Sequence, residues 1–297
     1  MPDYKIALWS LHLGFSPADT AAFAAHVEAG LARAADAGAR LLMLPEYAIE
    51  ACLAFKPDGL PETSEIPFLA DCGAELVGRL RDLPARHGVS LLMGTMPVRV
   101  GDGGYTNTAI LLTPDGREIR QDKLCLTPGE QDPGSWSLQP GRVLHTFELD
   151  GLKMAILICL DVELPALSCL LAGEDLDLLL VPSMTERLAG HHRVYDCAKA
   201  RAVELMTCVT VCGTVGAARG TTQNLTNVSG AAVYTPCEAE LGHTGLAAFA
   251  APTDGADGEE PFLVADVPVE SVRRLRRGGA EVWPGAWRAG HVALERR

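Results

Sequence analysis

Long hydrophobic runs are absent from this sequence. The best apolar stretch, residues 154–160, is flanked by Lys153 and Asp161 and is far shorter than the roughly 20 residues that a membrane-spanning helix needs. Residues 1–11 alternate like a β-strand and lack the basic region and the longer apolar core of a secretion signal. We therefore expect a cytoplasmic protein that makes no contact with a membrane.

Basic residues are also in short supply. The chain has 25 Lys and Arg against 38 Asp and Glu, which gives a formal net charge of −13. A surface of this sign gains little from contact with a polyanion, and it disfavours adsorption to anionic lipid. The composition therefore argues against nucleic acids and membranes as partners.

Signs of a disulfide framework or a metal site are lacking too. The nine cysteines are an odd number without framework spacing, and Cys169, Cys208 and Cys212 have apolar neighbours, so we expect reduced, buried thiols. His191 and His192 are adjacent and would point in different directions on a helix, with no cysteine or carboxylate at a recognised ligand spacing. We predict no metal and no cofactor.

What the sequence does contain is the composition of a globular protein. Of 297 residues, 48% are hydrophobic and 21% are charged, and a chain of this length buries a large core. No Ser- or Pro-rich linker and no internal repeat divides it. We predict one domain over residues 1–297, with a core at about 4–276 and a C-terminal tail at 277–297.

Hydrophobic periodicity predicts alternating strands and helices, interleaved with hairpins. Strands are expected at 5–10, 41–44, 90–96, 105–113, 118–124, 143–149, 153–158, 176–181, 208–213, 228–234, 245–249 and 262–267, and helices at 18–37, 65–87, 163–172, 192–206 and 269–276. A purely parallel sheet would lack so many hairpins. The pattern favours an α/β protein with two mixed sheets stacked together and helices outside.

Three reactive residues follow very apolar strands. Glu46 follows residues 41–45, Lys123 lies near the end of 118–124, and Cys159 follows Ile156-Leu157-Ile158. The carboxyl ends of strands are where α/β proteins build their sites. Each residue alone has an ordinary structural explanation, but a buried carboxylate, ammonium and thiol are costly unless they pair.

Together, these three groups support acyl transfer through a thioester. The thiolate is the nucleophile, a partly buried carboxylate can take the thiol proton, and an ammonium can stabilise the oxyanion formed on a carbonyl. The backbone N–H of Leu160, directly after Cys159, is a natural second oxyanion donor.

The same residues resemble the motifs of the carbon–nitrogen hydrolase family, the nitrilase superfamily. Four segments carry the resemblance: Leu44-Pro45-Glu46-Tyr47, the run from Asp122 to Glu130, Cys159-Leu160-Asp161-Val162-Glu163-Leu164-Pro165, and Ala200-Arg201-Ala202-Val203-Glu204. With the surrounding strands, the resemblance runs from the first strand to about Val267. It implies a four-layer α-β-β-α sandwich, and commonly a homodimer or higher homo-oligomer in which the outer helical layers pack together.

The resemblance also implies a role for each motif residue. Glu46 becomes the general base, Lys123 the stabiliser of the tetrahedral intermediate and Cys159 the nucleophile. Glu130, seven residues after Lys123, becomes a second carboxylate that positions Lys123 and the substrate. Nitrilases proper usually have Trp and Glu after the nucleophile, whereas Leu160 and Asp161 stand here, which points to the amidase-like branch.

Substrate specificity is expected to come from loops at 49–67, 131–140, 184–192 and 215–226. Tyr47, Trp136, Met184 and Phe55 are candidate pocket residues. Whether His191, His192 or Arg193 lines the pocket is left open by the sequence, since the first turn of a helix is usually solvated.

The leading interpretation is a thiol-dependent hydrolase of a small linear amide. Acyl or amide transfer on the same thioester, and nitrile or carbamoyl hydrolysis, remain open alternatives. Outside enzymes, a catalytically silent binding or assembly protein of the same fold would be expected to have lost one of the three residues. A papain-like hydrolase would need a histidine base, and none of the eight histidines lies at an evident strand end.

Overall fold

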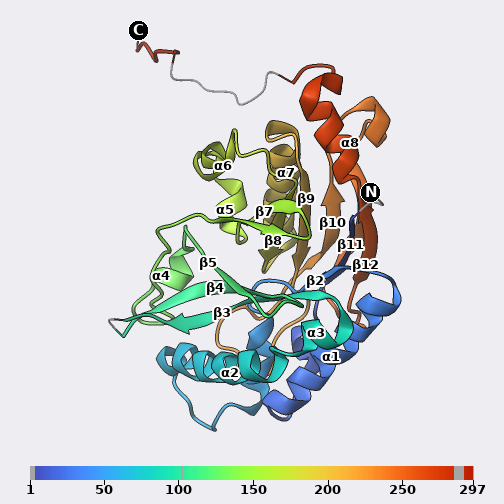
Figure 1. The fold of residues 1–297 in the computed structure, drawn as a ribbon. Coiled ribbons are helices and arrows are strands. Elements are labelled where there is room, and N and C mark those ends of the chain that lie inside the picture. Colours follow the sequence, from blue (N-terminus) through green and yellow to red (C-terminus); the bar gives the residue numbers. More distant parts are fainter. Residues whose placement is uncertain (1–3, 102, 284–290, 297) are drawn as a thin grey trace.

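Two six-stranded sheets form the centre of the molecule (Figure 1). The computed structural model describes residues 4–101, 103–283 and 291–296, so part of the predicted tail, 284–290 and 297, lies outside the described residues. The first sheet has the order β12-β1-β2-β3-β4-β5, formed by β1 (Tyr4–Trp9), β2 (Leu41–Met43), β3 (Ser90–Arg99), β4 (Tyr105–Leu112), β5 (Glu118–Asp122) and β12 (Phe262–Val267). The second has the order β11-β10-β9-β8-β7-β6, formed by β6 (Thr146–Leu149), β7 (Leu152–Ile156), β8 (Leu178–Ser183), β9 (Cys208–Gly213), β10 (Ser229–Tyr234) and β11 (Leu246–Thr253).

Both sheets are mixed, as predicted. β1, β2 and β3 are parallel, as are β7, β8 and β9, while the remaining pairs are antiparallel. Parallel neighbours need crossover connections, and helices supply them. The helices are α1 (Thr20–Asp36), α2 (Glu65–Leu80), α3 (Leu83–His87), α4 (Pro128–Gln131), α5 (Leu160–Glu163), α6 (Pro165–Leu171), α7 (Leu188–Glu204) and α8 (Val269–Arg274). Short 3₁₀ segments, among them Ala48–Phe55, and a π-helical turn at Leu275–Gly279 complete the chain.

The alternation of side chains in the strands builds two apolar layers. In β1, Ile6 and Leu8 belong to the cluster that contains Ile156, Leu180 and Val211 of the second sheet. Their neighbours in the strand, Ala7 and Trp9, belong instead to the cluster under α1 and α2. A strand with both faces buried is a short, wholly apolar run, which is the pattern of this sequence.

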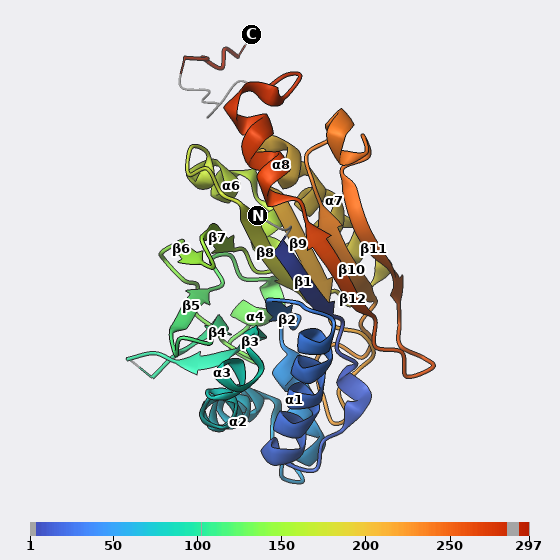
Figure 2. The ribbon, with the colours of Figure 1, turned by 45° about the vertical axis from the view of Figure 1, so that its right-hand side comes forward.

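Helices cover the outer face of each sheet. Figure 1 shows α1, α2 and α3 beside the first sheet and α5, α6 and α7 beside the second. Figure 2 shows β11 and β12, one from each sheet, side by side. This is the predicted four-layer α-β-β-α sandwich. Among the described residues, no helix is long and apolar enough to cross a membrane.

Two predicted helices are wrong in one respect, because each is interrupted. The helix expected at 65–87 is divided into α2 and α3, and Pro84 stands in the first turn of α3. The helix expected at 163–172 is α6, which begins at Pro165, and it is separated at Leu164 from the short helix α5, whose last residue is Glu163. Proline has no N–H for the helical ladder and clashes with the preceding turn, so it is accepted at a helix start but not inside one.

Candidate active site

Glu46 lies just beyond the carboxyl end of β2, and its side chain is 1% exposed. The turn that carries it packs tightly against β3 at Gly94. Gly94 has a φ of +74°, and a Cβ there would lie 1.9 Å from the carbonyl oxygen of Pro45. Only glycine allows this approach. Thr95 completes the support, because its Oγ1 accepts the backbone N–H of Tyr47 at 3.0 Å.

Lys123 follows β5 directly, and Glu130 lies in the short helix α4. The backbone N–H of Lys123 donates to the carbonyl of Asn107 in β4 at 2.7 Å. Glu130 forms a capping box with Thr127: the Glu130 N–H donates to Thr127 Oγ1 at 3.3 Å, and the Thr127 N–H donates to Glu130 Oε2 at 2.8 Å. The box fixes the Glu130 carboxylate before any ligand is bound.

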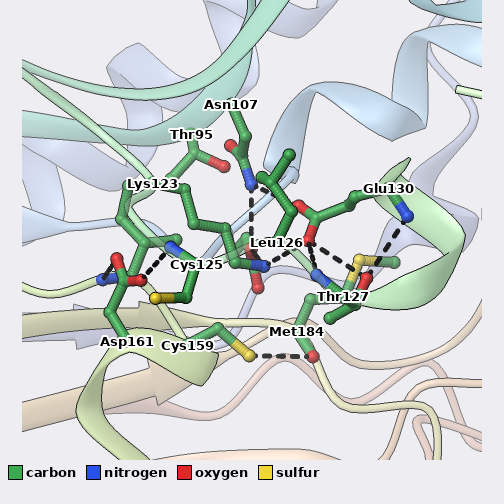
Figure 3. Close-up of polar contacts among 12 residues, drawn as sticks. Thr95, Asn107, Lys123, Cys125, Leu126, Thr127, Glu130, Cys159, Asp161 and Met184 are labelled. Atoms are coloured by element: carbon green, nitrogen blue, oxygen red, sulfur yellow. Dashed lines mark hydrogen bonds and ion pairs between the residues drawn. The ribbon is translucent and has the colours of Figure 1, made fainter. Parts of the chain in front are cut away.

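The ammonium of Lys123 lies between two carboxylates, and Figure 3 shows its contact with Glu130. Its Nζ is 2.8 Å from Glu46 Oε1 and 2.8 Å from Glu130 Oε2, and all three side chains are buried. Burial by itself lowers the pKa of Lys123, but the attraction of Glu46 and Glu130 outweighs burial and raises it. Burial likewise favours the neutral form of Glu130, yet Lys123 and the surrounding donors lower its pKa. Lys123 and Glu130 are therefore an ion pair at neutral pH.

A buried amide and a phenol complete this network. Asn107 Nδ2 donates to Glu46 Oε1 at 2.9 Å and to Glu130 Oε1 at 3.0 Å. The Tyr47 hydroxyl donates to Glu130 Oε1 at 2.7 Å, and its ring packs edge-on against Trp136 with centroids 4.9 Å apart. Tyr47 thus contacts the second carboxylate and the pocket wall together.

Cys159 occupies a strained turn between β7 and α5. Its φ of 48° and ψ of −107° are unusual for a residue with a side chain. The turn is held by the Cys159 N–H, which donates to the Pro182 carbonyl at 3.0 Å, and by the thiol, which donates to the Met184 carbonyl at 3.4 Å (Figure 3). Leu160 is the first residue of α5, and a helix offers no internal acceptor to that N–H.

The electrostatics of Cys159 and Glu46 are linked. Burial raises the pKa of the Cys159 thiol, the Glu46 carboxylate raises it further, and Lys123 opposes them. The thiol is therefore protonated at rest. Burial also raises the pKa of Glu46, although Lys123 and a hydrogen bond with the Cys159 thiol act against the rise. A carboxylate shifted toward neutrality beside a protonated thiol can accept its proton.

Glu46, Lys123, Glu130 and Cys159 open onto one cavity of about 100 Å³. Its walls combine the charged cluster with apolar and amide side chains from separate loops. The lining residues are Glu46, Tyr47, Lys123, Thr127, Gly129, Glu130, Trp136, Cys159, Met184, Gln223 and Asn224.

Comparison with known proteins shows the family of the chain. A model of the carbon–nitrogen hydrolase family matches residues 5–277. The chain belongs to the carbon–nitrogen hydrolase family.

Curated relatives of the chain include proteins named as hydrolases and one named as an amidase. The chain is 28% identical over 257 residues to the protein named "Probable hydrolase YhcX" of Bacillus subtilis, which covers 86% of this chain and 48% of that protein. The chain thus spans about half the length of that relative. It is 27% identical over 283 residues to a hydrolase of Mycobacterium tuberculosis, with 92% of both chains covered. Over 93 residues, it is 31% identical to an (R)-stereoselective amidase of a Pseudomonas species.

Solved structures of similar fold include the amidase of Nesterenkonia sp. AN1, of the nitrilase superfamily. The TM-score is 0.69 at 22% identity, with 93% of this chain and 94% of that chain covered. A glutamate-to-glutamine variant of that amidase has the acetamide moiety of fluoroacetamide added covalently at the active-site cysteine (TM-score 0.69, 22% identity, 94% and 95% covered). A cysteine-to-alanine variant is in complex with butyramide (TM-score 0.69, 21% identity, 93% and 95% covered). At this identity, the likeness establishes the shared fold.

Several residues that the sequence offered as possible pocket residues do not line the cavity. His191 is 2% exposed and lies against Tyr195, with ring centroids 3.8 Å apart and the rings tilted by 31°, so it is buried in the protein and not solvated. His192 and Arg193 are exposed, and none of the three lines the cavity described above. Phe55 packs against Phe68 and is likewise not in the cavity wall. The positions of His191, His192 and Arg193 follow from the start of α7, because the helix begins four residues earlier than predicted, at Leu188.

Asn107 is the site residue that sequence reasoning missed. It lies in an apolar strand, between Thr106 and Thr108, and is 0% exposed. A fully buried amide needs partners, and this need is the signal that could have pointed to it. Its partners, Glu46 and Glu130, are 61 and 23 residues away in the sequence, so only the folded chain reveals them. The prediction of buried cysteines is also wrong for Cys169, which is exposed on α6.

Proposed function

We propose that this carbon–nitrogen hydrolase cleaves the C–N bond of a small linear amide through a thioester on Cys159. The observation that carries the proposal is the position of Lys123. Its ammonium is 2.8 Å from each of two buried carboxylates, beside a thiol on a strained turn, and all of them line one cavity. Maintaining three buried charges is expensive, and a site that only packs would replace them with apolar groups.

The first half of the reaction forms the thioester. The Cys159 thiol transfers its proton to Glu46 as the sulfur attacks the amide carbonyl, and a C–S bond forms. The oxygen of the tetrahedral intermediate takes the negative charge, which Lys123 and the Leu160 N–H stabilise. Glu46 then returns the proton to the amide nitrogen, the C–N bond breaks, and ammonia or an amine leaves.

The second half regenerates the enzyme. Glu46 takes a proton from a water molecule, whose oxygen attacks the thioester carbonyl to form a second tetrahedral intermediate. The C–S bond breaks, the carboxylic acid leaves, and the proton returns to the Cys159 sulfur. Glu130 stays ionised throughout and keeps Lys123 charged and in place.

The cavity limits the substrate to a small acyl group. A volume of about 100 Å³ holds only a few heavy atoms, and Tyr47, Trp136 and Met184 supply its less polar wall. Short amides such as butyramide, which the Nesterenkonia amidase binds as a cysteine variant, fit this description. The single domain over 1–297, the homodimer or higher homo-oligomer and the cytoplasmic location stay predictions from the sequence.

An ammonia-release screen over short amides, carbamoyl amines and nitriles tests the proposal. Cys159→Ser should fall below about 1% of wild-type turnover, because a hydroxyl is far less acidic than a thiol and a weak base cannot activate it. Cys212→Ser is the matched control. Its thiol is also buried and also donates to a backbone carbonyl, that of Met43 at 3.5 Å, so turnover should stay within about twofold.

Three results would contradict the proposal. Turnover of Cys159→Ser within tenfold of wild type would remove Cys159 from the role of nucleophile. Ammonia from nitriles but not from amides would indicate nitrile hydrolysis. Acyl products that appear only when an amine acceptor is added would indicate transfer instead of hydrolysis.

A further inference from the structure

The two sheets carry separate halves of the site. Glu46, Lys123 and Glu130 follow strands of the first sheet, whereas Cys159 follows β7 of the second. A thiol and an ammonium that act on one substrate must be held in fixed relative positions, because a misplacement of a catalytic group by about 1 Å can cost roughly 100-fold in rate. A polar contact that crosses from one half to the other would provide this register.

Asp161 makes such a contact. It is the second residue of α5, 0% exposed, and its carboxylate accepts backbone N–H groups from both halves (Figure 3). From the lysine segment, Leu124 N lies 3.2 Å from both oxygens and Cys125 N lies 2.8 Å from Oδ1. From the cysteine segment, Ile158 N lies 3.2 Å from Oδ2. The donors are thus the two residues after Lys123 and the residue before Cys159.

We propose that Asp161 is a positioning residue, whose carboxylate locks the segment after Lys123 onto the Cys159 turn and so sets the placement of the ammonium relative to the thiol. This inference rests on the proposed function, because the placement matters only if Lys123 and Cys159 act on one substrate. Asp161 does not line the cavity described above, and it acts through the two segments that it joins.

Only an ionised carboxylate accepts from all three donors without opposing any of them. Oδ1 serves Cys125, Oδ2 serves Ile158, and Leu124 is shared. An asparagine has one acceptor oxygen, and its NH₂ group would face a backbone donor. With the amide oxygen in the place of Oδ1, Ile158 loses its acceptor; with the oxygen in the place of Oδ2, Cys125 loses the shortest contact and the lysine segment keeps only the 3.2 Å contact of Leu124. Asp161→Asn therefore weakens the connection between the halves while keeping the size of the side chain.

Titration of Asp161 should have the same effect. Burial raises its pKa to about 6, against the lowering by the backbone donors and by Lys123. The Cys125 thiol also interacts with it. At pH 7 the carboxylate is ionised, and as the pH falls through about 6 one oxygen becomes a hydroxyl. A raised pKa means that the folded state binds this proton more tightly than the unfolded chain does. Protonation of Asp161 at low pH therefore does not itself unfold the protein, and the loss of register is a local change within the folded state.

The experiment compares Asp161→Asn with Asp177→Asn. Asp177 is 3% exposed and also accepts a backbone N–H, that of Lys153 at 2.9 Å. It lies just before β8, whereas Pro182, which accepts the Cys159 N–H, lies near the other end of that strand. Four quantities are measured at pH 8: kcat and KM for the best amide of the screen, the rate at which iodoacetamide alkylates Cys159, and the thermal midpoint. Asp161→Asn should lower kcat about 100-fold while KM stays within threefold of the wild-type value, and it should lower the alkylation rate at least about fivefold. Asp177→Asn should lower the midpoint but leave both rates within twofold.

A folded Asp161→Asn with either rate within twofold of wild type overturns the inference. Failure of the proposed function is a separate result, because the wild type would then release no ammonia from any amide. The alkylation rates of the wild type and the variants could still be measured and compared.

Hydrogen exchange on the wild type keeps the inference testable if Asp161→Asn does not fold. After correction for intrinsic rates, the amides of Leu124 and Cys125 should be protected at pH 8 and lose at least tenfold of that protection at pH 5. The amide of Val211, in the buried strand β9, should stay protected at both. Equal protection of Cys125 at both pH values would overturn the inference.

Discussion

Replacement of Lys123 by methionine is the most informative single perturbation of this site. Methionine has a similar length and no charge, so the change removes the ammonium and leaves Glu46 and Glu130 facing the space between them. Lys123 is 2% exposed, which rules out the alternative that it is a solvated strand residue. Loss of one oxyanion donor is worth about 3 kcal/mol in the transition state, or roughly a hundredfold to a thousandfold in kcat.

The structure also indicates which carboxylate will take up a proton when Lys123 is lost. Two carboxylates at short range cannot both ionise cheaply. Glu130 keeps donors from Tyr47, Asn107 and Thr127, whereas among the described residues Glu46 keeps the hydrogen bond from Asn107. Glu46 should therefore be the protonated one. A protonated Glu46 cannot act as the base, so the thiol should also become less reactive.

Two rates measured on purified Lys123→Met decide the matter. Turnover should fall at least a hundredfold, and alkylation of Cys159 by iodoacetamide should become slower. Removing one partner of a buried ion pair costs about 3–5 kcal/mol of folding free energy, so a denaturant titration must show that the variant is folded. Lys153→Met is the control, because Lys153 also pairs with a carboxylate, that of Glu174 at 3.5 Å, but its side chain is 37% exposed.

Both rates within about twofold of wild type, the scale of a surface substitution, would refute the reasoning. Lost turnover with an unchanged alkylation rate would keep Lys123 as an oxyanion donor and discard its role in activating the thiol.

Two further changes test the rest of the charged cluster. Glu46→Gln should lower kcat at least a hundredfold, since an amide cannot take the thiol proton, and the free energy of unfolding should stay level or rise because a buried carboxylate with a raised pKa is removed; near-normal product formation would place the base elsewhere. Asn107→Leu should lower kcat at least about tenfold and the free energy of unfolding by about 3 kcal/mol, because two hydrogen bonds to carboxylates are lost; steady-state kinetics and urea titration check both, and an unchanged kcat would show that Asn107 only packs.

The sequence by itself determined the strands and the reactive residues at their ends. Runs such as residues 41–44 and 208–213 are apolar throughout, and a strand buried on both faces has this composition wherever it lies in a fold. The positions of Glu46, Lys123 and Cys159 after such runs are local information as well. Ordered motifs of the carbon–nitrogen hydrolase family then implied the sandwich, which the structure confirms.

Tertiary structure alone decided how these residues meet. Glu46 and Lys123 are 77 residues apart and share a contact of 2.8 Å, and no periodicity in the chain encodes that pairing. Asn107 and Asp161 are ordinary in sequence, one in an apolar strand and one after a cysteine. Their importance comes from hydrogen bonds to partners on other strands and on the other sheet. Local patterns report the environment that a residue prefers, whereas the partner of a buried polar group depends on the packing of the whole chain.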